Sequence, residues 1–333
     1  MHAAPAFAFL THAPMSLSFR PAQNADLPRC HALLAPIGPQ VYEPDVWAAL
    51  PALWARLIAE RRLEIHVFED SARPTAVKLF CMASGVFITP EFAATVAADP
   101  QPYLANQVYR RELTGDSVIP AHAAVGRANA GRGVDVLGID YGLERVNWTD
   151  LAGLRLLPLV PESLRAFVGG YRINSLHREL FGREIHLLAR TGGWRLRSAY
   201  RGKPTMSAGA APSVGRPALF GLTRNEALQR PGTLASLHFL YQEPRFRFTP
   251  AQQELLGRAL CGQSDTEAAG ALGISPSTVK KHWEAVLERV TRIRPDWLPE
   301  ESAAMEEGKR GVEKRRHLLN YLRQHLEELR PID

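Results

Sequence analysis

A closely spaced set of helix start and stop signals between Phe248 and Val290 constrains this 333-residue chain more than any other feature. Ser275 precedes Pro276, an order typical of a helix N-terminus, because the hydroxyl oxygen accepts from a free amide and proline has no amide to leave unpaired. Apolar residues then recur at the helical period, at Val279, Trp283, Val286, Leu287 and Val290. The sequence therefore predicts a helix that buries this stripe against neighbouring helices.

The opposite side of the same helix carries hydrogen-bond donors and cations. Its residues are Ser275, Ser277, Thr278, Lys280 and Lys281, with His282 and Glu284 beside them. A helix that is held by shorter helices and turns its donors outward is how a helix-turn-helix protein reads the major groove. We therefore predict double-stranded DNA as the partner of this face, with these seven residues as the contact set. The alternative is a packing helix whose lysines are only solvated.

The order and spacing of the segment resemble the LuxR-type helix-turn-helix of bacterial transcription factors. That pattern appears here at Thr249, Glu254, Leu255, Leu256, Gly262, Ser264, Glu267, Ala269, Ile274, Ser275, Thr278, Val279, Lys280 and His282. The resemblance implies a transcriptional regulator that binds promoter DNA sequence-specifically. It also implies a homodimer, because one recognition helix reads too few bases for selectivity.

The segment departs from the LuxR pattern at three places. Ala251 and Gln252 replace a charged pair in the first helix, and Glu284 lies where the family often has a cation, so it repels nearby phosphate. Pro295 and Pro299 interrupt the region in which a short fourth helix is expected. A second interpretation therefore stays open, an adaptor that uses a degenerate helix-turn-helix to bind a protein.

Bulk composition is that of an ordinary globular protein, with 46% apolar and 22% charged residues, and 333 residues suggest two or three domains. The net charge of +6 is compatible with nucleic acid. Three isolated cysteines, Cys30, Cys81 and Cys261, predict buried thiols in a reducing compartment and no metal site. The chain has no apolar run long enough to span a membrane and no basic leader, so we expect a cytoplasmic protein without a cofactor.

Residues 15–200 have the strand and helix patterns of an α/β domain. We expect strands at 16–20, 64–68, 77–87, 134–141, 184–190 and 194–200, and helices ending at 34 and spanning 47–58, 90–98, 101–113 and 161–181. On the last helix, Arg178 and Glu179 are expected to point outward. This order, with Leu17–Ala22 followed by Asp26, resembles the GNAT acyltransferase fold, a mixed sheet with helices.

The GNAT resemblance implies acyl-CoA chemistry where backbone amides at a helix N-terminus hold the pyrophosphate. The nearest candidate loop, Arg127–Gly133, has the wrong spacing and precedes a strand, so we predict a plain turn. Glu112 and Asp116 are four residues apart, and solvated carboxylates are the simpler interpretation. We therefore predict no catalytic residue, and a sensor or interaction domain for a small ligand or a protein. The alternative is a GNAT-like acyl-CoA-dependent transferase that carries a DNA-binding domain.

The rest of the chain is divided by composition. We expect an N-terminal extension at 1–14, followed by the α/β domain at 15–200 and a flexible linker at 201–216. A connecting segment at 217–245, the helix-turn-helix at 246–292 and a helical tail at 293–333 follow. The connecting segment is predicted to contain a helix near 224–229 and a strand at 233–241. Translation can begin at Met1 or at Met15, and the sequence leaves this open.

The tail combines a basic cluster with a leucine stripe. The cations are Lys309, Arg310, Lys314, Arg315 and Arg316. The stripe consists of Leu318, Leu319, Leu322, Leu326 and Leu329. A helix of this kind can pack on its own domain, add a phosphate contact beside the DNA, or dimerise, and the pattern fits all three.

Overall fold

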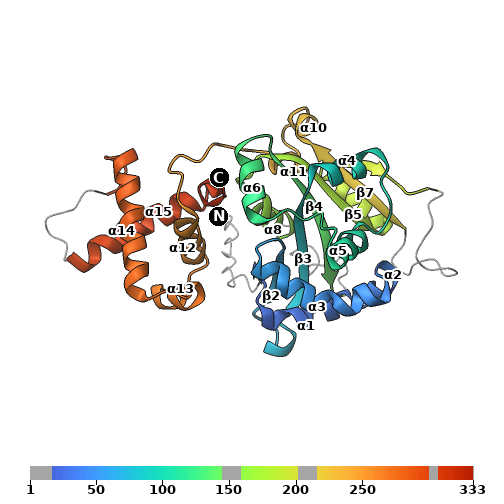
Figure 1. The fold of residues 1–333 in the computed structure, drawn as a ribbon, viewed down its shortest axis with the longest axis horizontal. Coiled ribbons are helices and arrows are strands. Elements are labelled where there is room, and N and C mark those ends of the chain that lie inside the picture. Colours follow the sequence, from blue (N-terminus) through green and yellow to red (C-terminus); the bar gives the residue numbers. More distant parts are fainter. Residues whose placement is uncertain (1–16, 145–158, 202–215, 300–306, 333) are drawn as a thin grey trace, which may run out of the picture.

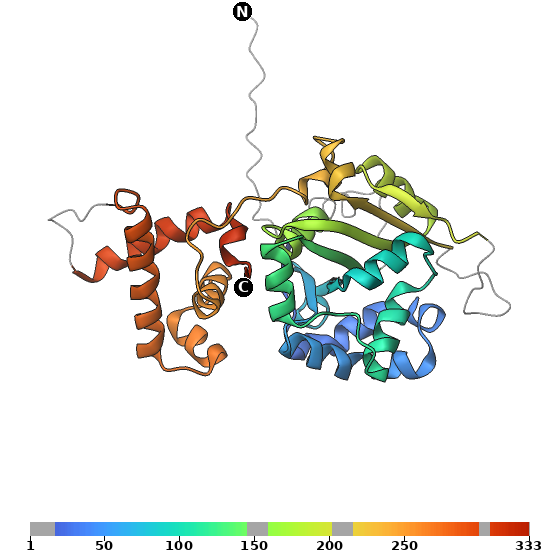
Figure 2. The ribbon, with the colours of Figure 1, turned by 45° about the horizontal axis from the view of Figure 1, so that its top comes forward.

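The computed structural model of this chain describes residues 17–144, 159–201, 216–299 and 307–332. Figure 1 shows an α/β part, coloured from blue to yellow, beside a group of helices coloured orange to red. In both views the C-terminus lies between the two (Figures 1 and 2). None of the helices in the described ranges combines the length and the apolar content that a bilayer crossing requires.

A seven-stranded sheet with the order β1-β2-β3-β4-β5-β7-β6 forms the centre of the α/β part. Its strands are β1 (Leu17–Pro21), β2 (Glu64–Asp70), β3 (Leu79–Ile88), β4 (Val134–Leu143), β5 (Ile173–Phe181), β6 (Arg195–Ser198) and β7 (Pro217–Thr223). Neighbouring strands are antiparallel, except that β4 and β5 are parallel. The expected mixed sheet with helices is therefore confirmed.

Helices pack on both faces of the sheet. They are α1 (Leu27–Leu34), α2 (Gly38–Val41), α3 (Pro44–Ala59), α4 (Pro90–Ala98), α5 (Leu104–Thr114), α6 (His122–Ala130), α8 (Leu159–Val168), α9 (Arg183–Thr191), α10 (Arg224–Leu228) and α11 (Leu234–Leu237). Two neighbours on β4 mark the two faces, because successive strand residues point to opposite sides. Leu137 belongs to the apolar cluster of Trp54 in α3, whereas Val136 belongs to that of Phe167 in α8.

Several predicted elements of the α/β part are wrong. The long helix expected at 161–181 is α8 followed by strand β5, and the chain turns between them at Gly170, whose φ is 82°. The strand expected at 184–190 is α9, and the strand expected at 233–241 contains α11 instead. Short apolar runs have no period of their own that separates strand from helix, and β5 takes its hydrogen bonds from strands distant in sequence.

Most of the linker expected at 201–216 falls outside the residues that the structure describes. Residues 202–215 lie outside the described part, but the strands on either side of them pair with each other, with Arg195 opposite Gly221. The strands before and after this segment therefore belong to one sheet. The connecting segment 217–245 likewise supplies β7, α10 and α11 to the α/β part.

The C-terminal part is helical in the described residues. It contains α12 (Pro250–Leu260), α13 (Asp265–Leu272), α14 (Pro276–Ile293), α15 (Glu307–Leu322) and a 3-10 helix, Leu326–Leu329. Two further 3-10 helices, Asn24–Asp26 and Thr75–Val77, lie in the α/β part. One apolar core joins the C-terminal helices, with Phe246, Leu256, Val286 and Leu318 among its buried members.

Candidate functional site

Side-chain caps define the starts of helices α12 to α14. Ser275 Oγ accepts from the Thr278 amide at 3.1 Å, as the sequence predicts for the helix of interest. Ser264 and Glu267 cap α13 reciprocally, each side chain accepting from the other's backbone amide. These caps pair amides that have no partner within the helix, so the turn between α13 and α14 is set by local chemistry.

The seven predicted DNA-contact residues lie together along the first turns of α14. Ser275, Ser277, Lys280, Lys281 and Glu284 are exposed, and Thr278 and His282 are partly buried. Ser275 Oγ also contacts the Thr278 hydroxyl at 2.9 Å, so these two hydroxyls hold the helix start. Among the described residues, neither Lys280 nor Lys281 has a hydrogen-bond or ion-pair partner, so both ammonium groups are free to bind an anion.

The inner side of α14 is anchored by Trp283. Val279, Val286 and Val290 are buried beside it, whereas Leu287, predicted in the same stripe, is only partly buried. The indole Nε1 donates to Asp265 Oδ1 at 3.1 Å, and Arg315 of α15 donates to the other Asp265 oxygen at 2.8 Å. The Arg315 guanidinium also lies 4.5 Å from the centre of the Trp283 ring. Helices α13, α14 and α15 therefore meet at this indole.

The tail helix α15 packs on its own helical group. Leu318 and Leu322 are fully buried in the core that contains Trp283. Packing on its own domain is one of the three roles that the sequence leaves open. It does not decide whether the helix also contacts DNA phosphate or dimerises. The side chains of Lys309 and Arg310 lie outside the described residues. Arg316 is exposed, whereas Arg315 is partly buried against the Trp283 ring and pairs with Asp265.

In the α/β part, the parallel strands β4 and β5 separate from each other. Their pairing runs from Val134 opposite Ile173 to Gly138 opposite Arg178. Beyond that point β4 continues along β3 and β5 continues along β7. The carboxyl ends of two parallel strands thus diverge in the middle of the sheet. In open α/β sheets ligands bind at such crevices, outside the carboxyl ends of the strands.

A partly buried cation, Arg178, lies where β4 and β5 separate. The side chain of Arg178 runs past Gly138, and its guanidinium is 5.1 Å from the centre of the Tyr141 ring. Within the described part of the chain no carboxylate pairs with it, and desolvation lowers the pKa of Arg178. Sequence reasoning expected this residue to point outward from a helix, which is wrong because β5 is a central strand. An anion placed here would relieve an uncompensated charge.

A small cavity of about 30 Å³ lies between α8 and the sheet, next to Arg178. Its lining includes His66, His177, Ser163 and Trp194. That volume corresponds to about one water molecule. Burial lowers the pKa of His177 to about 4, and its Nδ1 has no partner among the described residues. This histidine is therefore neutral in the folded protein near neutral pH.

A closed polar cluster surrounds Asp140, on the opposite side of β4. Its carboxylate accepts from the hydroxyls of Tyr42, Tyr109 and Ser84, with the last two at 2.6 and 2.9 Å. Trp54 Nε1 donates to the Tyr109 hydroxyl at 2.9 Å. Desolvation raises the pKa of Asp140. Both oxygens of this buried carboxylate accept from protein hydroxyls, so these contacts support a role in stabilising the core.

Glu179 is a second buried carboxylate that sequence reasoning placed outward. It accepts from the backbone amides of Tyr103 and Leu104, at 2.8 and 3.1 Å, and so caps the start of α5 from strand β5. Desolvation raises the pKa of Glu179 to about 7. A pKa near 7 suits a general base. Because both oxygens accept from helix amides, capping is the role that these contacts support.

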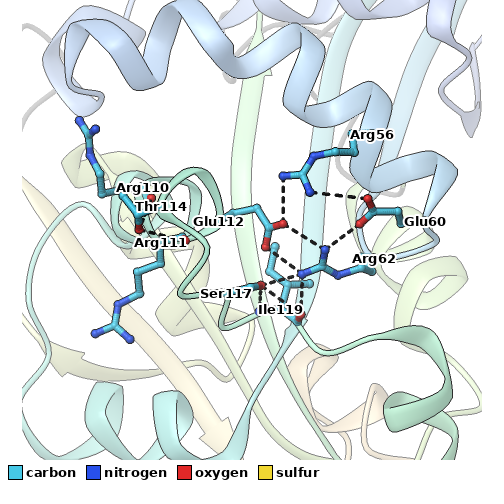
Figure 3. A network of polar contacts seen from close by, with 9 residues as sticks. All are labelled: Arg56, Glu60, Arg62, Arg110, Arg111, Glu112, Thr114, Ser117 and Ile119. Carbon is cyan, nitrogen blue, oxygen red and sulfur yellow. Dashed lines mark hydrogen bonds and ion pairs between the residues drawn. The ribbon is translucent and has the colours of Figure 1, made fainter.

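The predicted pair Glu112 and Asp116 is split by the structure. Glu112 is only 7% exposed and forms a two-pronged ion pair with Arg62, at 2.8 and 3.0 Å, and a second ion pair with Arg56 (Figure 3). These cations lower the pKa of Glu112. The expectation of a solvated carboxylate is therefore wrong for Glu112. Arg62 also donates to the Ile119 carbonyl, so the network joins α3, α5 and the loop after α5 (Figure 3).

Two other predictions have clear outcomes. Most of the segment Arg127–Gly133 belongs to the last turns of α6, where carbonyls and not amides are free, so it does not form an anion cradle. Cys30 and Cys81 are buried as expected, but Cys261 is exposed, because it caps the C-terminus of α12 at the surface.

A cleft of about 670 Å³ lies between the α/β part and helix α12. Arg61 forms an ion pair with Glu254 across it, and Arg258 and Arg330 also line it. Sequence reasoning missed this cleft, together with Arg178 and Glu179, because each depends on contacts between segments far apart in the chain.

No family model matches this chain, and no curated protein matches it. Solved structures that resemble part of it include a spermidine N-acetyltransferase from Vibrio cholerae, at 10% identity and a TM-score of 0.36, over 65% of this chain and 98% of that one. Arabidopsis thaliana NAA60 in complex with acetyl-CoA is similar at 14% identity and a TM-score of 0.36, over 63% of this chain and 99% of that one. A likeness at this level assigns no activity to this chain.

Proposed function

We propose that this chain is a DNA-binding transcriptional regulator of the bacterial cytoplasm, with a LuxR-type helix-turn-helix in residues 246–292 and the α/β part as its sensor. The observation that supports this most is the two-sided character of α14. Its Trp283 side is buried, while Ser277, Lys280 and Lys281 on the other side are exposed. Helix α13, capped by Ser264, precedes it at the short turn that this motif requires.

The proposed interface combines positioning and base reading. Each lysine that neutralises a DNA phosphate releases bound counterions, which favours binding. The short polar side chains of Ser277 and Thr278 can form hydrogen bonds with base edges. Glu284 opposes phosphate and limits how far along α14 the DNA backbone can lie. We propose a homodimer, because two recognition helices reach half-sites about 34–36 Å apart.

Selection from a library of random duplexes tests the proposal directly. The full chain is incubated with the library, bound duplexes are sequenced, and the affinity of the enriched duplex is measured at several salt concentrations. We expect an enriched sequence with two related half-sites and an affinity that falls as salt rises. Absence of any enriched sequence, with weak binding to all duplexes, would favour the adaptor interpretation instead.

A second candidate function, GNAT-like acyl-CoA-dependent transfer, is favoured by one observation. Strands β4 and β5 separate beside Arg178, and an anionic ligand would compensate this cation. Calorimetry with coenzyme A and acetyl-CoA, together with a thiol-release assay over a panel of amines, separates the alternatives. Binding with amine-dependent thiol release would make the chain an enzyme. Binding without release would make acyl-CoA thioesters the sensed ligand.

A further inference from the structure

Six residues after α15, near the end of the tail, contact both parts of the molecule. We name residues 326–331 the C-terminal clasp. They follow α15 and lie between the α/β part and α12, where the C-terminus is marked in both views (Figures 1 and 2). The sequence showed only two leucines of a stripe here, so this contact is visible in the structure alone.

On the α/β side, the clasp packs onto the turn between α8 and β5. Gly170 has a φ of 82°, and a Cβ at this position would lie 2.3 Å from the Glu327 amide nitrogen. Arg330 donates to the carbonyls of Ala166 and Gly169, the latter at 2.8 Å. These carbonyls end α8, where a cation also suits the negative end of the helix dipole. The same guanidinium lies 4.7 Å from the centre of the Tyr171 ring.

A buried asparagine of α6 secures the end of the clasp. Asn129, which is 1% exposed, donates to the Pro331 carbonyl at 2.8 Å. Its side-chain oxygen accepts from the Arg172 amide, also at 2.8 Å. One side chain therefore holds both the start of β5 and the C-terminal clasp.

On the helical side, the clasp holds the entrance to α12. The Glu328 carboxylate, which is fully buried, accepts from the amides of Arg245 and Phe246 at 2.8 and 2.9 Å. Gln253 of α12 donates to the Arg330 carbonyl at 2.8 Å. Arg330 thus bonds to α8 through its side chain and to α12 through its backbone.

We propose that the C-terminal clasp couples the α/β part to the DNA-binding helices, so that a change at the α8–β5 turn is transmitted to α12. Helix α8 also lines the cavity beside Arg178, through Leu164 and Phe167. A ligand that moves α8 would therefore displace the contacts of Arg330. The coupling itself rests on contacts within the chain, and its consequence for DNA rests on the proposed function.

Hydrogen exchange of the full chain tests the coupling with two matched glycine variants. Gly170 and Gly115 both have a φ of 82°, but only Gly170 faces the clasp, since nothing lies within 4 Å of a Cβ at Gly115. We expect Gly170→Ala to raise the exchange rates of the amides in α12 and the clasp at least about tenfold, as a local opening does. Gly115→Ala should leave the same amides unchanged.

Equal exchange in α12 for both glycine variants overturns the proposal. If Gly170→Ala does not fold, Arg330→Ala is compared with Arg323→Ala. Arg323 is an exposed arginine just after α15 that donates to Asn320 of this helix. Here too, faster exchange in α12 for the first variant alone is expected, and equal exchange overturns the coupling. A chain that shows this exchange pattern but selects no duplex would retain the clasp and refute the DNA-binding function, so the two failures are distinguishable.

Discussion

Glu179 ties the stability of this protein to pH. Its pKa is about 7 in the folded chain, against 4.5 for an ordinary glutamate, because burial disfavours the charged form. Between these values the unfolded chain has lost the proton and the folded chain still holds it. The folded state therefore binds more protons, and the free energy of unfolding falls as pH rises through this window.

We predict that Glu179→Gln removes this fall. Between about pH 4.5 and pH 7 the variant should gain roughly 3 kcal/mol relative to the wild type, the energy that corresponds to such a pKa difference. Urea unfolding at several pH values measures it, with Glu91→Gln, an exposed residue of α4, as the control. A constant difference between Glu179→Gln and wild type across the range contradicts the prediction.

The buried histidines change the pH dependence of stability in the opposite direction, so the variant must be compared with wild type at each pH. Burial lowers the pKa values of His177 and His238 to about 4 from 6.5. In that window the unfolded chain binds more protons, so their contribution to stability is lost as pH falls from about 6.5 to 4. Both histidines remain in Glu179→Gln, and their effect cancels in the difference.

Trp283 is the residue on which the helical core depends. We predict that Trp283→Ala lowers the free energy of unfolding of the helical part by about 3–5 kcal/mol, the range for a buried large aromatic. It also removes the indole contacts to Asp265 and Arg315. Ile293→Ala, at the partly exposed end of the same helix, is the control. Denaturant-induced unfolding measures both variants, and an equal loss of unfolding free energy in the two would refute this role.

At the scale of the element, α14 carries the predicted DNA affinity in its first turns. We expect Lys280→Ala and Lys281→Ala each to weaken binding to the selected duplex and to lower the salt slope by roughly one unit, the loss of one phosphate contact. Arg292→Ala tests position, because Arg292 is an exposed cation at the other end of the same helix. A salt titration in which all three variants match wild type would argue against this face as the interface.

Elements also differ in how far local sequence determines them. The cap at Ser275 is formed as predicted, and Ser264 caps α13 in the same way, because a cap and its amides are within three residues of each other. The segment 161–181 was predicted as one helix, and its second half is a central strand. The apolar residues of β5 fit a helical stripe as well as a buried strand, and the hydrogen bonds of β4 and β7 decide between them.

At the scale of the whole molecule, the pairing of β6 with β7 predicts how the chain responds to a cut. A protease site inserted between residues 202 and 215 should be cleaved without releasing the C-terminal fragment. Strand β7 stays paired with both β5 and β6, and the C-terminal clasp adds contacts to α8. Size-exclusion chromatography of the cleaved protein measures this, and the same sample in denaturant should separate. A free C-terminal fragment under native conditions would restore a linker between domains.

The sequence by itself determined the caps of α13 and α14, the buried side of α14 and the α/β class of the N-terminal part. These follow from spacing within a few residues, where hydroxyl caps, proline and helical periodicity act locally. Only the tertiary structure decided that β5 is a strand, that Glu179 is buried, that Arg178 lies beside Tyr141, and that the tail reaches back to Gly170. Each of these depends on partners tens to hundreds of residues away, and no local pattern encodes which distant amide, carbonyl or ring will be there.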